Sequence, residues 1–554
     1  MRAGNRIDRI GTALLVFLSG IARRVQCPPF CFKNQDFMIE CLKKESSLFM
    51  NNYQPVIGLE IHAELKTKSK MFCSCPNAFG LEKEPNQNIC EVCTGQPGAL
   101  PVINEEAVKK VLKTALTLNC QINDWAKFDR KNYFYPDLPK GYQISQYDAP
   151  FSQNGFLEIL GAKIRITRIH LEEDTGKLVH PAAADYSLVD LNRAGVPLME
   201  LVTEPDLKSG LETRQFCQEL QLILRYLDVS DADMEKGQMR CEVNISLREI
   251  PRNDAEFADA ELRGKEKKLG TKVEIKNLNS FRAVEHSIDY EIKRQTEILA
   301  RGEKIVQETR GWDDAKGETF SQRVKEEAHD YRYFPEPDLP PLAGLDVLAR
   351  ELKKEIPELP AQKRERLAKE YNLPSGDVEI LVSNLETARY FEATASELAN
   401  WAKSAEPKID LNKAVKLAVN YLITEIPRIA NSLQIADYKL SEKITPENFA
   451  EFTKVILQGV ISSSGAQTLL KEMFLTGADP SHIIQEKDLT QVSGEEELNQ
   501  AISEVLSANP GPAEDYKKGK QNALMFLVGK VMAQTRGKAN PQVVTGMLRK
   551  RMKE

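Results

Sequence analysis

The sequence contains no Gly-x-x-x-x-Gly-Lys-[Ser/Thr] run, which excludes a nucleotide site of the P-loop type. It is also poor in cysteine, with ten in 554 residues, and four of these form two close pairs. This uneven placement indicates a metal site in a reducing compartment rather than a disulfide framework. The net charge of -6 argues against a surface that binds nucleic acid everywhere, although it leaves room for a local basic patch.

Long hydrophobic runs are lacking too, and the apolar run from Ile10 to Ala22 is too short for a transmembrane helix. It lies in an arginine-rich leader, residues 1–50, that is unlike the rest of the chain. Such a leader resembles an organellar transit peptide, and its basic-then-apolar order also resembles a secretory signal. Because Met50 directly precedes the first strand-like segment, we favour an upstream in-frame start, with a mitochondrial transit peptide as the second interpretation.

The length allows about three or four domains. The composition, 28% charged and 42% hydrophobic, is that of an ordinary soluble globular protein. Four prolines between 335 and 341 mark a domain edge near residue 344. Beyond it, amphipathic patterns predict helices at 345–371, 387–403, 413–433, 447–460 and 497–507.

The segment Val56–Leu65 alternates apolar residues at odd positions with Glu60, His62 and Glu64 at even ones. Side chains alternate between the two faces of a strand, so this pattern predicts a strand with one apolar face and one row of carboxylate, imidazole and carboxylate. Such a row could hold a divalent metal or serve acid/base chemistry. A solvated outer face is the alternative.

The paired cysteines are Cys73 and Cys75, then Cys90 and Cys93. Two cysteine pairs separated by a turn-rich loop are typical of a zinc knuckle, in which tetrahedral Zn²⁺ is held by two short chelates. Because four thiolates would complete the coordination shell, we predict structural rather than catalytic zinc. The Cys-x-Cys spacing of the first pair departs from the usual pattern, which leaves unligated cysteines as the alternative.

Three further segments combine strand patterns with charge. The strand-like Ile164–Leu171 runs into Glu172-Glu173-Asp174, either a negative site or a charged hairpin tip. Glu200 interrupts an apolar run, where a carboxylate needs a partner or a cation. Arg240–Arg248 and Lys272–Asn279 again alternate charged and apolar residues. Together these strands predict an antiparallel sheet backed by helices, whose acids could hold Mg²⁺ while Arg and Lys hold phosphate oxygens.

Two segments mix aromatic and charged residues without periodicity: 127–147 and 329–338. For the first we predict a packed or substrate-facing loop. The last stretch, 517–554, holds ten Lys or Arg and one acid. This segregation indicates a nucleic-acid partner, with a plain pair of basic helices as the alternative.

Several long motifs resemble those of the B subunits of aspartyl/glutamyl-tRNA amidotransferases. They are Val56-Ile-Gly-Leu-Glu-Ile-His62, Lys127-Phe-Asp-Arg-Lys-Asn-Tyr-Phe-Tyr-Pro-Asp137, His170-Leu-Glu-Glu-Asp174, Asn192-Arg-Ala-Gly-Val-Pro-Leu198, Glu274-Ile-Lys-Asn-Leu-Asn-Ser-Phe281, Asp330-Tyr-Arg-Tyr-Phe-Pro-Glu-Pro-Asp338 and Arg536-Gly-Lys-Ala-Asn-Pro541. The resemblance extends over residues 53–554.

The resemblance implies an α+β chain. A glutamine-synthetase-like catalytic cradle carrying the zinc knuckle is expected at 51–344, a helical domain at 345–480 and a basic, tRNA-binding helical tail at 481–554. It implies ATP-dependent phosphorylation of the side-chain carboxyl of Glu-tRNA(Gln) or Asp-tRNA(Asn), and then amidation with ammonia from a separate amidase subunit. A small third subunit would complete the complex, and no membrane partner is expected.

The resemblance also implies site residues. The metal-binding positions fall on His62, Glu173 and Glu200, with Glu60 beside them, and these four are the expected catalytic residues. Arg240 and Lys276 on neighbouring strands are expected to bind ATP, and the four knuckle cysteines to bind Zn²⁺. A bacterial cytoplasmic location is expected, or the mitochondrial matrix if the leader is a transit peptide. Two rival interpretations remain open: a non-catalytic, zinc-stabilised tRNA-binding scaffold, and a divalent-metal hydrolase built on Glu60 and His62.

Overall fold

The computed structural model describes residues 52–77, 84–181, 184–250, 269–324, 331–404, 410–491, 495–535 and 537–553. The predicted leader, residues 1–50, lies outside the described residues. The chain divides into two compact units, with the boundary between Ile356 and Pro357. The boundary lies beyond the predicted edge at 344 because α7 (Leu345–Leu352) and the short 3-10 helix η2 (Lys353–Glu355) belong to the first unit. Their place there is fixed by packing of α7 on α3 (Glu105–Thr117) and by an ion pair between Lys113 and Glu355 at 2.7 Å.

The first unit is built on a nine-stranded sheet with the order β14-β13-β12-β11-β1-β10-β7-β6-β2. Neighbouring strands are antiparallel except β12 and β13, which are parallel and connected through the helix α6. The strands are β1 (Tyr53–Glu64), β2 (Gln121–Ile122), β6 (Ser152–Ile159), β7 (Ala162–Glu173), β10 (Pro197–Thr203), β11 (Met239–Glu249), β12 (Val273–Leu278), β13 (Glu308–Asp313) and β14 (Glu318–Val324). The predicted antiparallel-dominated sheet of an α+β chain is confirmed.

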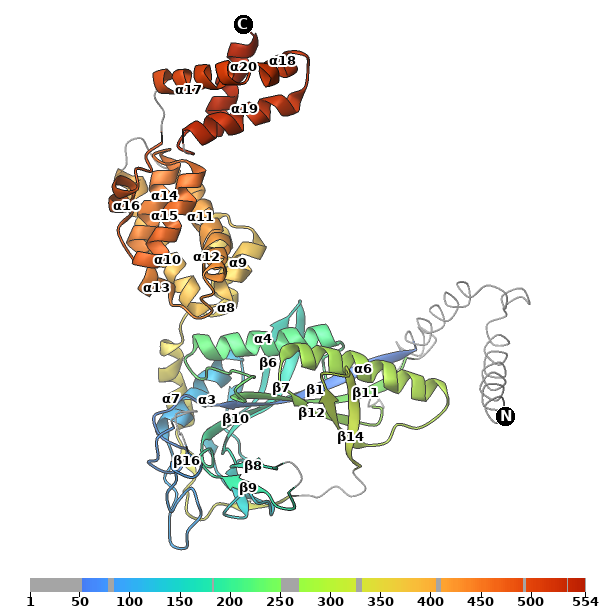
Figure 1. Cartoon of the computed structure of the whole chain (residues 1–554). Helices are drawn as coiled ribbons and strands as arrows, with labels where there is room; N and C mark the ends of the chain where they lie inside the picture. Colours follow the sequence, from blue (N-terminus) through green and yellow to red (C-terminus); the bar gives the residue numbers. More distant parts are fainter. Residues whose placement is uncertain are drawn as a thin grey trace, which may run out of the picture. The chain divides into compact units, whose positions relative to one another are not determined.

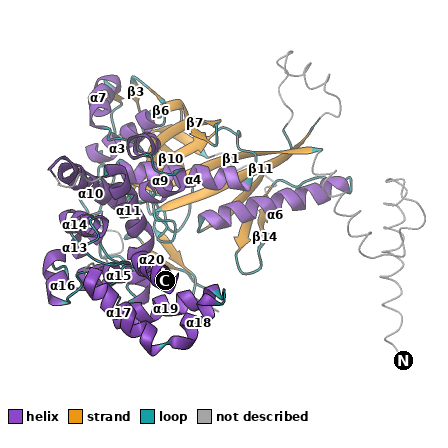
Figure 2. Cartoon of the chain, turned by 90° about the horizontal axis from the view of Figure 1, so that it is seen from above, coloured by secondary structure: helices purple, strands orange, loops and turns teal. Residues whose placement is uncertain are grey.

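One face of this sheet is covered by two helices, α4 (Gly210–Tyr226) and α6 (Phe281–Ala300), as Figures 1 and 2 show. Each begins at a serine, Ser209 or Ser280, whose side chain accepts a hydrogen bond from a first-turn N–H. The odd positions of β1, Ile57, Leu59 and Ile61, are fully buried. Contact between the Sγ atoms of Cys217 on α4 and Cys241 on β11, 3.7 Å apart, places the hydrophobic core between this face and the helices.

The opposite face carries polar side chains. The first unit also contains three small sheets, ordered β15-β4-β5, β16-β3 and β8-β9. Their strands are β3 (Trp125–Ala126), β4 (Asp129–Asn132), β5 (Tyr142–Ser145), β8 (Lys177–Val179), β9 (Leu188–Asp190), β15 (Arg332–Pro335) and β16 (Leu342–Ala343). The loop predicted at 127–147 therefore contains two strands. The prediction was wrong there because β4 pairs with β15, a partner distant in sequence that local periodicity does not reveal.

The described part of the second unit is helical. Its helices include α8 (Pro360–Tyr371), α9 (Ser375–Val382), α10 (Leu385–Ser404), α11 (Leu411–Asn420), α12 (Ile426–Ser432), α13 (Leu440–Lys443), α14 (Pro446–Leu457), α15 (Ser463–Thr476) and α16 (Pro480–Glu486). The single helix predicted at 345–371 is interrupted because Pro357 and Pro360 cannot continue a helix. The one predicted at 413–433 contains a π-helical turn, η3 (Tyr421–Glu425), just before Pro427.

The last helices share a hydrophobic core of their own. They are α17 (Glu495–Ala508), α18 (Pro510–Lys517), α19 (Gln521–Gln534) and α20 (Pro541–Lys553). Ile502 of α17, Leu527 of α19 and Leu548 of α20 are fully buried members of this core. The tail boundary predicted at 480/481 falls at the start of α16, whereas the residues of the separate core begin with Leu498.

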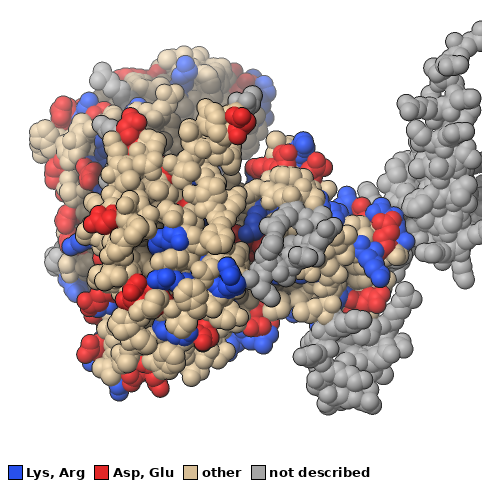
Figure 3. All heavy atoms as spheres, turned by 90° about the horizontal axis from the view of Figure 1, so that it is seen from below, with Lys and Arg blue, Asp and Glu red and all other residues tan. Residues whose placement is uncertain are grey.

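In the part of the chain that the structure describes, no helix is long and apolar enough to cross a membrane. On the face shown in Figure 3, Lys and Arg side chains are interspersed with Asp and Glu side chains.

Candidate functional site

Four polar side chains form one row across four neighbouring strands. The register places Arg240 of β11 opposite His62 of β1, His62 opposite Glu200 of β10, and Glu200 opposite His170 of β7. Directly paired residues share a face of a sheet, so all four project from the face that α4 and α6 leave uncovered. The structure thus brings together the polar faces that the sequence predicts for β1 and β11.

Around this row lies a cluster of imidazoles and carboxylates, which we call the acid-imidazole cluster: Glu60, His62, His170, Glu172 and Glu200. His62 Nε2 lies 3.3 Å from Glu200 Oε2, 3.7 Å from Glu172 Oε1 and 3.8 Å from Glu60 Oε1. His170 Nε2 lies 3.4 Å from Glu200 Oε2 and 3.6 Å from Glu172 Oε2. The cluster offers two overlapping three-residue sets, each with ligand atoms within 4.8 Å of one another, and Glu200 belongs to both.

Two carboxylates of the cluster, Glu200 and Glu172, keep their charge in spite of burial, whereas burial and the nearby Glu200 carboxylate raise the pKa of Glu60. Burial opposes ionisation of Glu200, yet the adjacent His170 and His62 hold its pKa well below the usual value. Burial likewise opposes the charge of Glu172, whose pKa is lowered by the hydrogen bond from His170 and by the charge of Lys131. Burial opposes protonation of His170, but Glu200 and Glu172 raise its pKa to about 9. At neutral pH the cluster therefore pairs carboxylates with a protonated imidazole, a charge arrangement that a divalent cation could replace.

The structure does not bring Glu173 into this cluster. Glu172 shares the polar face of β7 with His170, whereas Glu173, the next residue, lies on the other face. The buried Glu173 carboxylate forms an ion pair with Lys140 and accepts a hydrogen bond from the Ile144 amide at 3.0 Å. Glu172 thus occupies the place for which the sequence predicts Glu173. The acids at 172–174 are all buried, which excludes the alternative of a charged hairpin tip.

Glu64, the third polar residue along β1 after Glu60 and His62, faces a different partner. Burial and the adjacent Asp174 carboxylate raise the pKa of Glu64 to about 9. Asp174 in turn pairs with Arg240 Nη2 at 2.7 Å and with Arg193 Nε at 3.5 Å. Glu64 is therefore a neutral acid near pH 7, positioned beside the cluster rather than within it.

The two cations predicted to bind ATP, Arg240 and Lys276, lie on the polar face and are already paired with acids. Arg240 contacts Asp174, and Lys276 Nζ lies 2.8 Å from Glu242 Oε2 and 3.6 Å from Glu274 Oε1. These ion pairs do not show whether Arg240 or Lys276 binds ATP, so that role stays a prediction.

The small sheet β15-β4-β5 forms a wall beside the cluster. Ser145 Oγ of β5 donates to Glu172 Oε2 at 2.8 Å, and Gln143 Nε2 donates to the Glu173 carbonyl at 2.7 Å. Burial opposes the charge of Lys131 on β4, but the carboxylates of Glu172 and Glu200 help to raise its pKa. The functional candidates that sequence reasoning did not single out are His170, Glu172, which it named only within the acidic run 172–174, and Lys131. The alternation of His170 and Glu172 with Ile169 and Leu171 is a signal that could have found the first two.

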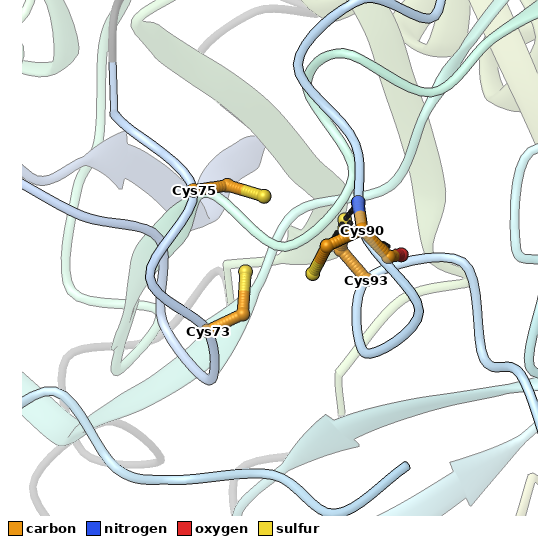
Figure 4. A group of neighbouring side chains, drawn as sticks. All are labelled: Cys73, Cys75, Cys90 and Cys93. Carbon is orange, nitrogen blue, oxygen red and sulfur yellow. Dashed lines mark hydrogen bonds between the residues drawn. The ribbon is translucent and has the colours of Figure 1, made fainter.

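The four paired cysteines converge in space, with their sulfur atoms turned toward one another (Figure 4). Their Sγ atoms all lie within 4.8 Å of one another. The hydrogen bond from Cys73 lowers the pKa of Cys93 to about 5, assisted by the Cys90 amide and the Lys70 ammonium. Lys70 is fully buried, with Nζ 3.9 Å from Cys93 Sγ and 2.8 Å from the Asn88 carbonyl. Four thiols with a buried counter-charge fit a tetrahedral Zn²⁺.

Metal analysis of the reduced protein should find about one zinc per chain, the ratio of a single four-thiolate site. Cys90→Ser should lose this zinc and lower the melting temperature, because metal binding contributes to the stability of the knuckle. Cys120→Ser, which alters a buried thiol outside the knuckle, should keep its zinc. Reduced wild-type protein without zinc would contradict the assignment.

Comparison with known proteins gives the context of these sites. Residues 55–347 match the family model of the GatB/GatE catalytic domain, and residues 406–552 match that of the GatB domain. Similar curated proteins are the aspartyl/glutamyl-tRNA(Asn/Gln) amidotransferase B subunits of Caldicellulosiruptor bescii and Thermotoga maritima. Each is 48% identical to this chain over 507 residues, covering 91% and 90% of the chain and 99% and 98% of the relative, respectively.

The corresponding protein of Persephonella marina is 47% identical over 505 residues, which cover 90% of this chain and all of the relative. Both family models and these full-length relatives agree. The chain belongs to the family of aspartyl/glutamyl-tRNA(Asn/Gln) amidotransferase B subunits.

Proposed function

We propose that this chain is the component of the amidotransferase that activates the side-chain carboxyl of Glu-tRNA(Gln) or Asp-tRNA(Asn) with ATP and then forms the amide with ammonia. The observation that carries this proposal is the acid-imidazole cluster on the uncovered face of the sheet, in a chain of the B-subunit family. The products would be Gln-tRNA(Gln) and Asn-tRNA(Asn).

The residues of the cluster fit a divalent cation such as Mg²⁺. The carboxylates of Glu60, Glu172 and Glu200 would hold it together with His62 or His170, because their ligand atoms lie within 4.8 Å in each three-residue set. When bound, the ion would neutralise negative charge on the transferring phosphoryl group. Glu172 takes the role that the resemblance gave to Glu173.

The reaction balances in two steps. In the first, a side-chain carboxylate oxygen attacks the γ-phosphorus of ATP, the bond to the ADP oxygen breaks, and an acyl phosphate forms. In the second, ammonia attacks the acyl carbon, and inorganic phosphate leaves with the oxygen that had belonged to the carboxylate. The amide nitrogen loses a proton, which the departing phosphate can accept. Activation is needed because a free carboxylate is a poor acyl donor.

The cations around the cluster would position and neutralise phosphate. Arg240 shares the row of His62 and Glu200, and Lys276 lies on the neighbouring strand β12. Lys131 faces Glu172 and Glu200 from the wall. Arg and Lys stabilise phosphoryl transfer by charge-assisted hydrogen bonds to its oxygens. The wall formed by β15-β4-β5 beside the cluster would help to keep water from the acyl phosphate, whose hydrolysis would waste ATP.

The partners in this proposal are an amidase subunit that supplies ammonia, a small third subunit and the misacylated tRNA. The relatives are named as subunits of an amidotransferase, which supports the presence of partner subunits. We place the complex in the cytoplasm of a bacterial cell, where aminoacyl-tRNA is made and used. The knuckle zinc would be structural in this scheme, because four thiolates leave no open position.

We also propose that the helices α17 to α20 bind tRNA. Their separate core means that truncation inside them, for example after Ala513, would expose buried residues such as Ile502. Charge neutralisation is therefore the better test. Suitable exposed lysines are Lys517, Lys518 and Lys550.

Changing these three lysines to glutamine should raise the KM for aminoacyl-tRNA and flatten its dependence on salt, because each phosphate contact releases counterions. Turnover at saturating tRNA should fall much less. Neutralising three exposed lysines elsewhere, Lys353, Lys354 and Lys413, provides the matched control. Lower turnover with unchanged tRNA affinity and salt slope would identify these helices as a structural brace.

The function itself is tested with the complete complex. Purified chain, partner subunits, glutamine, Mg²⁺ and ATP should convert Glu-tRNA(Gln) or Asp-tRNA(Asn) into the amidated product, and leaving out ATP should stop the conversion. A non-catalytic scaffold predicts that substitutions in the acid-imidazole cluster leave conversion unchanged. A metal hydrolase predicts activity without tRNA or ATP. Either result would overturn the proposal.

A further inference from the structure

Two tyrosines form a stacked pair on the wall beside the acid-imidazole cluster. The rings of Tyr147 and Tyr333 have centroids 4.2 Å apart and an interplanar angle of 16°. Tyr333 belongs to β15, and Tyr147 lies two residues after the end of β5. The pair therefore connects segments that the sequence shows only as two distant aromatic-rich motifs.

Tyr147 is exposed although one side of its ring is covered. The residue is 60% exposed, whereas Tyr333 is half-buried. The backbone amide of Tyr147 donates to Asp129 Oδ2 at 3.1 Å, and Asp129 Oδ1 lies 2.7 Å from Lys127 Nζ. The backbone of Tyr147 is thus held in place while its side chain remains accessible, as a preorganised contact surface requires.

The pair is close to the candidate active site. Ser145, two residues before Tyr147, donates to Glu172 of the cluster at 2.8 Å. Tyr333 stands directly opposite Lys131 in the pairing of β15 with β4. Lys131 Nζ also lies 4.9 Å from the ring centroid of Tyr331. A cation therefore adjoins both the tyrosine pair and the acids of the cluster.

We propose that Tyr147, backed by Tyr333, is the platform on which the adenine ring of ATP stacks. An exposed aromatic ring offers a flat π-face to a purine base, and such stacking tolerates small shifts in position. This inference rests on the proposed function and names the residues that receive the nucleotide base.

The position of Lys131 favours ATP over the other adenine in the reaction, the 3′-terminal adenosine of tRNA. In ATP the ribose and two phosphates, α and β, lie between the base and the reacting γ-phosphorus, so a cation between platform and cluster complements it. In aminoacyl-tRNA the amino acid is esterified to the ribose of the terminal adenosine. No phosphate then lies between that base and the reacting carboxyl.

The test uses the reconstituted complex and three variants: Tyr147→Leu, Tyr147→Phe and Tyr186→Leu. Tyr147→Leu removes the aromatic face and should raise the KM for ATP about tenfold, the scale of a lost base stack. Turnover at saturating ATP and the KM for aminoacyl-tRNA should stay near wild-type values. Tyr147→Phe keeps the ring and should restore the KM for ATP. Tyr186 is equally exposed, at 60%, so Tyr186→Leu controls for the loss of a surface tyrosine.

Three outcomes would overturn the proposal that Tyr147 stacks on the adenine ring. A raised KM for aminoacyl-tRNA with an unchanged KM for ATP would assign the ring to the terminal adenosine. If Tyr147→Leu left the KM for ATP and the KM for aminoacyl-tRNA unchanged, the tyrosine pair would be only a packing contact. Failure of Tyr147→Phe to restore the KM would show that the hydroxyl, not the ring, matters. Failure of the proposed function is distinguishable, because the wild-type complex would then not consume ATP for amidation.

Discussion

Replacing Glu200 with alanine should abolish ATP-dependent amidation while leaving tRNA binding nearly intact. Glu200 Oε2 lies 3.3 Å from His62 Nε2 and 3.4 Å from His170 Nε2, and this carboxylate belongs to both possible metal-ligand sets. Its loss removes a charge from the place where phosphoryl transfer must be stabilised, so turnover should fall roughly a thousandfold, at the upper end for one preorganised group. Single-turnover formation of amidated tRNA measures the loss.

The control for this variant is Glu158→Ala, which removes an exposed carboxylate from β6 of the same sheet. It should retain full activity. Filter binding of aminoacyl-tRNA, performed on both variants, separates failed chemistry from failed binding. If Glu200→Ala turned over ATP at the wild-type rate, the cluster would not be the site of activation.

Glu172→Gln and Glu173→Gln should differ sharply, although the two residues are neighbours. Glu172 faces His62 and His170, whereas Glu173 is bound to Lys140 on the other face of β7. Glu172→Gln should weaken binding of Mn²⁺, used as a probe for Mg²⁺, by about tenfold or more, because it removes one charged oxygen ligand. It should also abolish activation of the carboxyl group.

Glu173→Gln should keep the wild-type affinity for Mn²⁺, whatever its effect on the Lys140 ion pair. Titration of each variant, followed by electron paramagnetic resonance of free Mn²⁺, gives the affinity without any activity assay. Weakened Mn²⁺ binding in Glu173→Gln, with normal binding in Glu172→Gln, would restore the assignment first drawn from the resemblance.

The alternating segments allowed the centre of the fold and part of its site to be predicted. Apolar odd positions and polar even positions on β1 predict which face is buried, and the structure buries Ile57, Leu59 and Ile61 as expected. The same argument applies to β11, whose Arg240 stands opposite His62. Strict alternation carries this information because each residue step reverses the side-chain direction.

The rest of the site depends on where strands end and which strands pair. A strand predicted to stop at Leu171 leaves the directions of Glu172 and Glu173 undetermined, whereas the observed β7 continues through Glu173 and sets them on opposite faces. The wall could not be predicted, because β4 pairs with β15 across a long separation in sequence. Lys131 and the tyrosine pair depend on that pairing for their place beside the cluster.

Transfer of oxygen-18 from the side-chain carboxyl to inorganic phosphate tests the central claim most directly. Glu-tRNA(Gln) labelled with oxygen-18 in both side-chain carboxyl oxygens would be amidated by the complete complex with unlabelled ATP, and the phosphate released would be examined by mass spectrometry. Activation through an acyl phosphate predicts ADP and one labelled oxygen in each phosphate formed with product. Unlabelled phosphate, or release of AMP and pyrophosphate, would contradict phosphorylation of the carboxyl group by this complex.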